Sequence, residues 1–162
     1  MPKVEKGELR VPAICNGSVI DHIPVDKLMQ VVRLLKPEQL PYPITIGQNF
    51  ASKKLGRKGI IKVENKQFTP EEVSMLALVS SNVVINVIRN FEVVQKIRTE
   101  LPDTIEGIVR CTNPKCITNH EPMRSRFKVL DKEKGTLQCC YCTRKIEHKD
   151  IIIDMKEEDG RN

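Results

Sequence analysis

The sequence predicts an α+β protein made of two domains, and three observations lead to this prediction. β-Branched runs alternate with two amphipathic segments over roughly the first hundred residues, which is typical of mixed strands and helices. Pro and Gly then interrupt the segment 100–107, as expected of a connector. Five of the six cysteines follow that connector. We therefore expect one domain over residues 1–102 and a second over residues 103–162.

The first domain is expected to begin with a strand and a helix. After a polar arm, residues 11–24 mix apolar residues with Asn16-Gly17, which indicates a strand with a turn or bulge. The next segment, 25–35, is followed by Pro37, which ends a helix. Its apolar residues recur at helical spacing, with four of them on one face: Val25, Leu28, Val32 and Leu35.

Two further strands and a second helix follow. Residues 41–50 and 59–65 carry strand patterns joined by a loop at 51–58. The run Thr69-Pro70-Glu71-Glu72 is a capping box with proline at the first helical position, so a helix begins there. Its apolar stripe is Val73, Leu76 and Ala77.

The β-branched run 82–94 predicts a single final strand in this domain. The order is then strand, helix, strand, strand, helix, strand. That order is the split βαβ, or ferredoxin-like (βαββαβ), pattern. The second domain contains only short strand candidates, at 126–130, 136–139 and 150–155, and is expected to be small and antiparallel.

The cysteines of the second domain have the spacing of a metal site. Cys111-x4-Cys116 and Cys139-x2-Cys142 are two pairs separated by 22 residues, and each pair suits a tight turn that presents two thiolates to one tetrahedral centre. One structural Zn²⁺ held by these four cysteines would supply the folding free energy that a small core lacks. The alternative, four reduced buried thiols, explains neither the pairing nor the crowding.

The remaining cysteines and two histidines are assigned simpler roles. Cys140 is expected to point away from the turn formed by its neighbours, and Cys15 to be a small core residue. His120 and His148 lie near enough in sequence to replace a cysteine, but a surface or supporting role is favoured.

Composition and missing motifs exclude several classes of function. The start of the chain has no apolar signal region and no later run is long enough to span a membrane, so we expect a cytoplasmic protein without a membrane partner. Aromatic residues make up 4%, which counts against a nucleic-acid platform of stacked rings. The chain has no Walker loop and no recognisable nucleophile motif. Nucleotide binding without hydrolysis is compatible with these absences.

The chain closely resembles the family of aspartate carbamoyltransferase regulatory chains. The likeness rests on the motifs VIDHIP, TIGQN, GRKGIIKVEN and NVIRNFEVVQK, followed in the same order by the two cysteine pairs. It covers residues 11 to 152. The resemblance implies a non-catalytic subunit of pyrimidine biosynthesis, whose first domain binds the nucleotide effectors CTP, UTP and ATP, with or without Mg²⁺. It also implies that the zinc domain docks on a catalytic chain, within a dodecamer of two catalytic trimers and three regulatory homodimers.

The resemblance also implies roles for individual positions. Asp21 and His22 would reach the ribose and phosphates, Lys96 the phosphates, and Lys62 the sugar and base. The other residues expected to line the effector site are Ala13, Ile14, Lys58, Asn86, Ile88, Phe91 and Val93. Asn113 and Arg144 would face the catalytic chain. Pro12, Phe91 and Lys115 depart from the familiar pattern, where an acid, a Tyr and an Asn are usual.

Two other classes of function compete with the regulatory chain. Residues 111–149 carry 9 Lys/Arg against 4 Asp/Glu, which would suit a basic zinc-ribbon protein that binds nucleic acid. The scarcity of aromatic residues disfavours this, and we expect no nucleic-acid partner. A zinc deaminase would need an H-x-E motif and an open zinc position, whereas His120 is followed directly by Glu121 and Pro122.

Overall fold

The computed structural model describes residues 13–154, which divide into two compact units. The first unit ends at Thr99 and the second begins at Glu100, and each has a buried core of its own. Pro12, the polar arm and the charged tail of the sequence lie outside the described residues.

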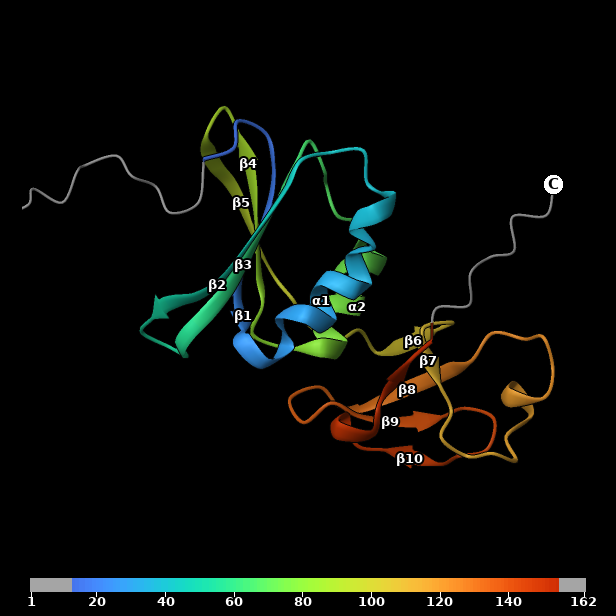
Figure 1. The fold of residues 1–162 in the computed structure, drawn as a ribbon. Helices are drawn as coiled ribbons and strands as arrows, with labels where there is room; N and C mark the ends of the chain where they lie inside the picture. Colours follow the sequence, from blue (N-terminus) through green and yellow to red (C-terminus); the bar gives the residue numbers. More distant parts are fainter. Residues whose placement is uncertain (1–12, 155–162) are drawn as a thin grey trace, which may run out of the picture. The chain divides into compact units, whose positions relative to one another are not determined.

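The first unit is a five-stranded antiparallel sheet with two α-helices on one face (Figure 1). Its strands are β1 (Gly17–Pro24), β2 (Ile44–Ser52), β3 (Gly56–Glu64), β4 (Val84–Arg89) and β5 (Glu92–Arg98). They stand in the order β2-β3-β1-β4-β5, and all neighbours are antiparallel. The predicted α+β, ferredoxin-like class is confirmed, with β5 as an additional strand.

The helices of this unit are η1 (Val25–Lys27), α1 (Leu28–Leu35), η2 (Pro37–Gln39) and α2 (Pro70–Val79). The capping box forms as predicted, because the Thr69 hydroxyl oxygen accepts a hydrogen bond from the Glu72 backbone N–H at 3.2 Å. Helix α1 buries Leu28 and Val31. The predicted stripe is therefore partly wrong, since Val25, Val32 and Leu35 are only half-buried.

Buried and half-exposed residues alternate along the strands, so the two faces of the sheet differ in burial. The side chains on the helical face are buried, and they include Ile20, Ile61, Val63 and Ile85. The residues between them, such as Val19, Lys62 and Asn86, are half-exposed on the opposite face. This second face, called the open face below, is therefore accessible to a ligand.

The run 82–94 forms two strands rather than the single strand predicted. Strands β4 and β5 are joined by Asn90 and Phe91, with φ values of 50° and 65°. Two consecutive residues with positive φ form the type of turn whose twist matches a hairpin. Asn tolerates this conformation, whereas a bulky aromatic residue rarely adopts it.

Thr99 anchors the end of the first unit. Its side chain is buried, and its hydroxyl and backbone N–H both donate to the carbonyl oxygen of Val83, at 2.9 Å and 3.0 Å. Strand β5 therefore ends one residue before a fixed point in the core, and the next residue, Glu100, belongs to the second unit.

The second unit is a small antiparallel β domain, as predicted. Its elements are β6 (Thr104–Glu106), β7 (Val109–Arg110), η3 (Ile117–Asn119), β8 (Arg126–Asp131), β9 (Thr136–Cys139), β10 (Lys145–Ile146), η4 (His148–Asp150) and β11 (Ile152–Ile153). One sheet has the order β10-β9-β8-β6, and β11 pairs with β7. Phe127, Leu137 and Ile146 form its fully buried centre. Strand β6 lies within the segment predicted to be only a connector, because its pairing with β8 orders it.

None of the helices between residues 13 and 154 has the length and apolar character that a membrane span needs.

Candidate functional site

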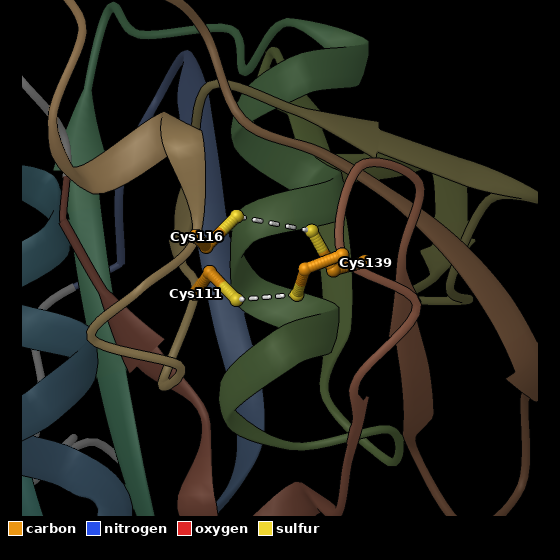
Figure 2. Close-up of side chains that lie close together, drawn as sticks. Cys111, Cys116 and Cys139 are labelled. Atoms are coloured by element: carbon orange, nitrogen blue, oxygen red, sulfur yellow. Dashed lines mark hydrogen bonds between the residues drawn. The ribbon is translucent and has the colours of Figure 1, made fainter.

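Four cysteine side chains of the second unit converge on one point. Cys111 follows β7 and Cys116 precedes η3, while Cys139 ends β9 and Cys142 lies in the turn before β10. Their sulfur atoms all lie within 4.8 Å of one another. Figure 2 shows Cys111 and Cys116 on one side of the cluster and Cys139 on the other. The structure thus brings together all four residues predicted to bind zinc.

The sulfur separations fit a tetrahedral metal centre. Cys111 and Cys142 are 3.5 Å apart at sulfur, and Cys116 and Cys139 are 3.7 Å apart. Zinc–sulfur bonds of about 2.3 Å in tetrahedral geometry place the sulfurs about 3.8 Å apart. A disulfide would need about 2.05 Å, and all four cysteines are unpaired. The donor set therefore fits a closed structural metal site.

Side chains of the surrounding loops brace the two cysteine turns. The Asn119 side-chain amide donates to the backbone carbonyl oxygens of Cys111 and Asn113, at 2.9 Å and 2.8 Å. Arg144 donates to the carbonyl oxygen of Thr112 at 3.2 Å. The cysteine turns are thereby tied to each other as well as to a metal. Arg144 and Asn113, expected at a partner interface, also have this internal role.

The acidity of the thiols differs around the cluster. Burial raises the pKa of the Cys111 thiol to about 12, against an opposing hydrogen bond from the Asn113 backbone. Burial also raises the pKa of the Cys139 thiol. At Cys142 burial acts in the same direction, but hydrogen bonds from the Arg144 backbone and the Asn113 side chain outweigh it and lower the pKa to about 6. A bound cation would deprotonate coordinating thiols outright, which removes these differences.

The neighbouring cysteines and histidines lie outside the cluster. The Cys140 side chain is exposed, as predicted, while its backbone N–H donates to the Arg126 carbonyl oxygen at 2.9 Å. Cys15 is exposed too, so its assignment to the core is wrong, because it precedes the first residue of β1. His120 is exposed, with its Nε2 2.7 Å from the Pro114 carbonyl oxygen. His148 packs beside Gly135.

A second candidate site lies on the open face of the first unit. Strand register places Lys62 opposite Val19, Val19 opposite Asn86, and Asn86 opposite Lys96. Directly opposed residues share a face of an antiparallel sheet, so these four form one row across β3, β1, β4 and β5. Burial lowers the pKa of the Lys62 ammonium, while the charge of Asp21 raises it.

Asp21, His22 and Lys58 lie to one side of this row, toward the end of β1 and the start of β3. Strand β1 contains a bulge, since Ile20 pairs with Ile61 and Ile23 with Gly59. Two residues, Asp21 and His22, therefore oppose one, and His22 has a φ of 58°. The Lys58 ammonium lies 2.9 Å from Oδ1 and 3.2 Å from Oδ2 of Asp21.

The apolar candidates lie at the other end of β1. Ile88 is opposite both Gly17 and Val93. The Phe91 N–H donates to the Cys15 carbonyl oxygen at 3.0 Å, which places the β4–β5 turn beside the segment that contains Ala13 and Ile14. Phe91 and Val93 are exposed, while Ile88 and Ile14 are buried. Gly17 and Asp21 are about 13 Å apart along an extended strand, so the candidates spread along a surface rather than around one point.

Two buried polar atoms of this surface have no hydrogen-bond partner among the described residues. They are Nδ1 of His22 and Oδ1 of Asn86. Buried polar groups are nearly always paired, and an exception requires an explanation.

Family profiles match both units. A profile described as "Aspartate carbamoyltransferase regulatory chain, allosteric domain" matches residues 9–100. A second, described as "Aspartate carbamoyltransferase regulatory chain, metal binding domain", matches residues 103–152. Together they cover most of the chain. The chain belongs to the family of aspartate carbamoyltransferase regulatory chains.

Curated aspartate carbamoyltransferase regulatory chains are similar over nearly their whole length. The protein from Parabacteroides distasonis is 52% identical over 153 residues, covering 94% of this chain and 99% of the relative. The protein from Phocaeicola vulgatus is 55% identical over 148 residues, covering 91% and 96%. The archaeal protein from Pyrococcus abyssi is 45% identical over 150 residues, covering 91% and 99%.

Membership of the aspartate carbamoyltransferase regulatory family settles the class of function. The chain is a regulatory rather than a catalytic subunit, and the resemblance drawn from the sequence is confirmed. The family name also implies a catalytic chain as partner. The alternative of a basic zinc-ribbon protein that binds nucleic acid is not favoured, because both halves of the chain match this one family.

In this regulatory chain, sequence reasoning missed two residues that support the metal site. Asn119 braces the cysteine turns, and the Thr118 hydroxyl lies 3.1 Å from the Cys116 sulfur. Neither has a distinctive spacing. Their only signal is their position within three residues of a predicted ligand.

Proposed function

We propose that this regulatory chain binds the nucleotide effectors CTP, UTP and ATP on the open face of its first domain, residues 1–102. The row of Lys62, Asn86 and Lys96 carries the proposal, because it places two cations and an amide side chain on one face of the sheet. A nucleoside triphosphate, with or without Mg²⁺, needs cations for its phosphates and acceptors for its hydroxyl and amino groups. For each residue of the site we propose the effector contact that the family resemblance implies.

Each end of the surface then has a role. Lys96 binds the phosphates, while Asp21 and His22 reach the ribose and its phosphates. The apolar end formed by Ile88 and Val93 receives the base, to which Ala13 and Ile14 offer backbone groups.

The second domain, residues 103–162, holds one Zn²⁺ through Cys111, Cys116, Cys139 and Cys142 and docks on the catalytic chain. The sulfur separations support zinc, and four thiolates close its coordination sphere so that no position remains for catalytic water. When bound, the metal supplies folding free energy rather than chemistry. Asn113 and Arg144 face the catalytic chain from the braced cysteine turns.

The chain acts within a cytoplasmic complex of two catalytic trimers and three regulatory homodimers. Free thiols clustered for a metal are consistent with a reducing compartment. The sheet of the first unit has two outer strands, β2 and β5, and either offers unpaired backbone groups to a second copy of the chain. Effectors regulate the enzyme by binding its two quaternary states with different affinity.

Titration calorimetry of the zinc-loaded chain tests the effector site. Lys96→Met is expected to weaken CTP binding by roughly 10-fold to 100-fold, as a lost charge-assisted hydrogen bond would. Lys54→Met removes an equal charge from the exposed β2–β3 turn and serves as the matched control. Absence of CTP, UTP and ATP binding by the wild-type chain would overturn the proposal.

A further inference from the structure

The ion pair between Asp21 and Lys58 occupies one end of the proposed effector site. The Lys58 ammonium contacts both carboxylate oxygens, at 2.9 Å and 3.2 Å. The side chains of Lys58 and Asp21 are only 17% and 19% exposed. The pair is therefore largely removed from solvent, where an ion pair is screened less than on an open surface.

The fold holds Asp21 in this position. The bulge of β1 places Asp21 and His22 opposite the single residue Ile60, and the His22 backbone N–H donates to Oδ1 of Asp21 at 2.6 Å. Bulges re-aim side chains and are a feature of functional sites. Here the bulge turns a carboxylate toward the lysine of the neighbouring strand.

This arrangement creates a conflict for any polyphosphate. The Lys58 ammonium directs donors at both oxygens of Asp21 and has three N–H groups in all. A phosphate therefore either takes the remaining N–H beside the carboxylate, or displaces Asp21 and leaves it partly buried without its cation. Breaking such a pair by removing one partner is costly, because the other charge remains uncompensated. The carboxylate also repels the phosphate directly.

A nucleotide resolves the conflict and an inorganic polyphosphate does not. Ribose hydroxyl groups donate hydrogen bonds, and an ionised carboxylate only accepts them. When the phosphates of a ligand bind Lys58 and its ribose hydroxyl donates to Asp21, these contacts replace the broken ion pair. Inorganic triphosphate can bind Lys58, but it has no sugar hydroxyl to donate to Asp21.

We propose that the Asp21–Lys58 ion pair is a specificity filter that rejects polyphosphates without a hydroxylated sugar. Asp21 is the specificity-determining residue. It weakens the binding of a bare polyphosphate, and this effect matters as much as its hydrogen bond to ribose. The inference rests on the effector function proposed above and adds a reason why that site discriminates among anions.

Calorimetry with two probes, CTP and inorganic triphosphate, tests the filter on the zinc-loaded full chain. Asp21→Asn is expected to tighten triphosphate binding about tenfold and to weaken CTP binding, because the ribose hydroxyls lose a charged acceptor. Asparagine keeps an oxygen that can accept from the His22 N–H, so the bulge is expected to persist. Asp26→Asn, at an exposed position, makes the same change in net charge and is expected to alter neither affinity.

A double variant distinguishes the loss of the Asp21–Lys58 ion pair from the general electrostatic effect of removing the Asp21 charge. If Asp21 acts mainly by holding Lys58, most of the gain in triphosphate affinity is lost when Asp21→Asn is made in a Lys58→Gln chain, and only the part due to direct repulsion remains. A gain as large there as in the single variant overturns the proposal. So does an unchanged triphosphate affinity in the single variant.

The wild-type chain provides a test that does not depend on any variant folding. CTP lacking the 2′ and 3′ hydroxyl groups keeps its base and triphosphate, and is expected to bind about tenfold more weakly than CTP. Equal binding contradicts the filter while leaving the effector site intact. Failure of CTP itself to bind contradicts the proposed function instead.

Discussion

The Thr118 hydroxyl lies 3.1 Å from the sulfur of Cys116, and Thr118 is almost completely buried. A hydroxyl at this distance can donate to a metal-bound thiolate, which lowers the charge that the sulfur has to carry and fixes its direction. Such supporting hydrogen bonds are often worth 10-fold to 100-fold in metal affinity.

Thr118→Val is expected to weaken zinc binding by roughly tenfold, because it keeps the shape of the side chain and removes the donor. Thr118→Ser, which keeps the hydroxyl, is the matched control and is expected to bind zinc within about threefold of the wild type. Competition with a chromogenic chelator measures both. Equal zinc affinity in the valine and serine variants would contradict a role for the hydroxyl.

Cys139 and Cys140 are adjacent, yet one is buried in the cluster and the other is exposed. Cys139→Ser is expected to abolish stoichiometric zinc binding, because three thiolates leave the tetrahedral site open. Cys140→Ser is expected to retain one zinc per chain. Metal analysis of the purified variants gives the answer, and the reverse pattern would shift the ligand register by one residue.

Removal of the metal is expected to unfold the second unit and release the catalytic chain. The sheet of that unit buries few large side chains, with Phe127, Leu137 and Ile146 at its centre, and small domains of this kind depend on metal for stability. A mercurial thiol reagent followed by a chelator should therefore abolish coelution of the two chains. Coelution after complete loss of zinc would refute this dependence.

Phe91 combines strain with exposure, since its φ is 65° and its side chain is 66% exposed. Phe91→Gly is expected to stabilise the first unit by about 1 kcal/mol, because glycine adopts positive φ without a clash. If the aromatic ring contacts the effector, CTP affinity should fall at the same time. Thermal unfolding and calorimetry measure the two effects, and Phe91→Ala, which keeps the strain but not the ring, separates them.

Local signals made part of this fold predictable. The capping box at Thr69 fixes the start of α2 through a hydrogen bond to Glu72, and both residues are visible in four letters of sequence. The spacing of the four cysteines likewise predicts the cluster, because two tight turns determine where the thiols point.

Pairing between distant segments explains what could not be predicted. Strand β6 is three residues long and is ordered by β8, so its own sequence looks like a connector. The turn at Asn90-Phe91 lacks the glycine that usually marks a hairpin. Lys58 and Asp21 are 37 residues apart, and their contact depends on a bulge that no single segment reveals.

Strand β5 carries Lys96 and runs directly into Thr99, which is fixed to Val83, and then into Glu100 of the second unit. Residues 100–103, which form neither helix nor strand, connect Thr99 to β6. Along the covalent chain, β5 leads directly to Glu100, whereas β2 is separated from Glu100 by two hairpins and a helix. If an effector binds Lys96 as proposed, the strand that holds it is also the strand that leads directly along the chain into the second unit.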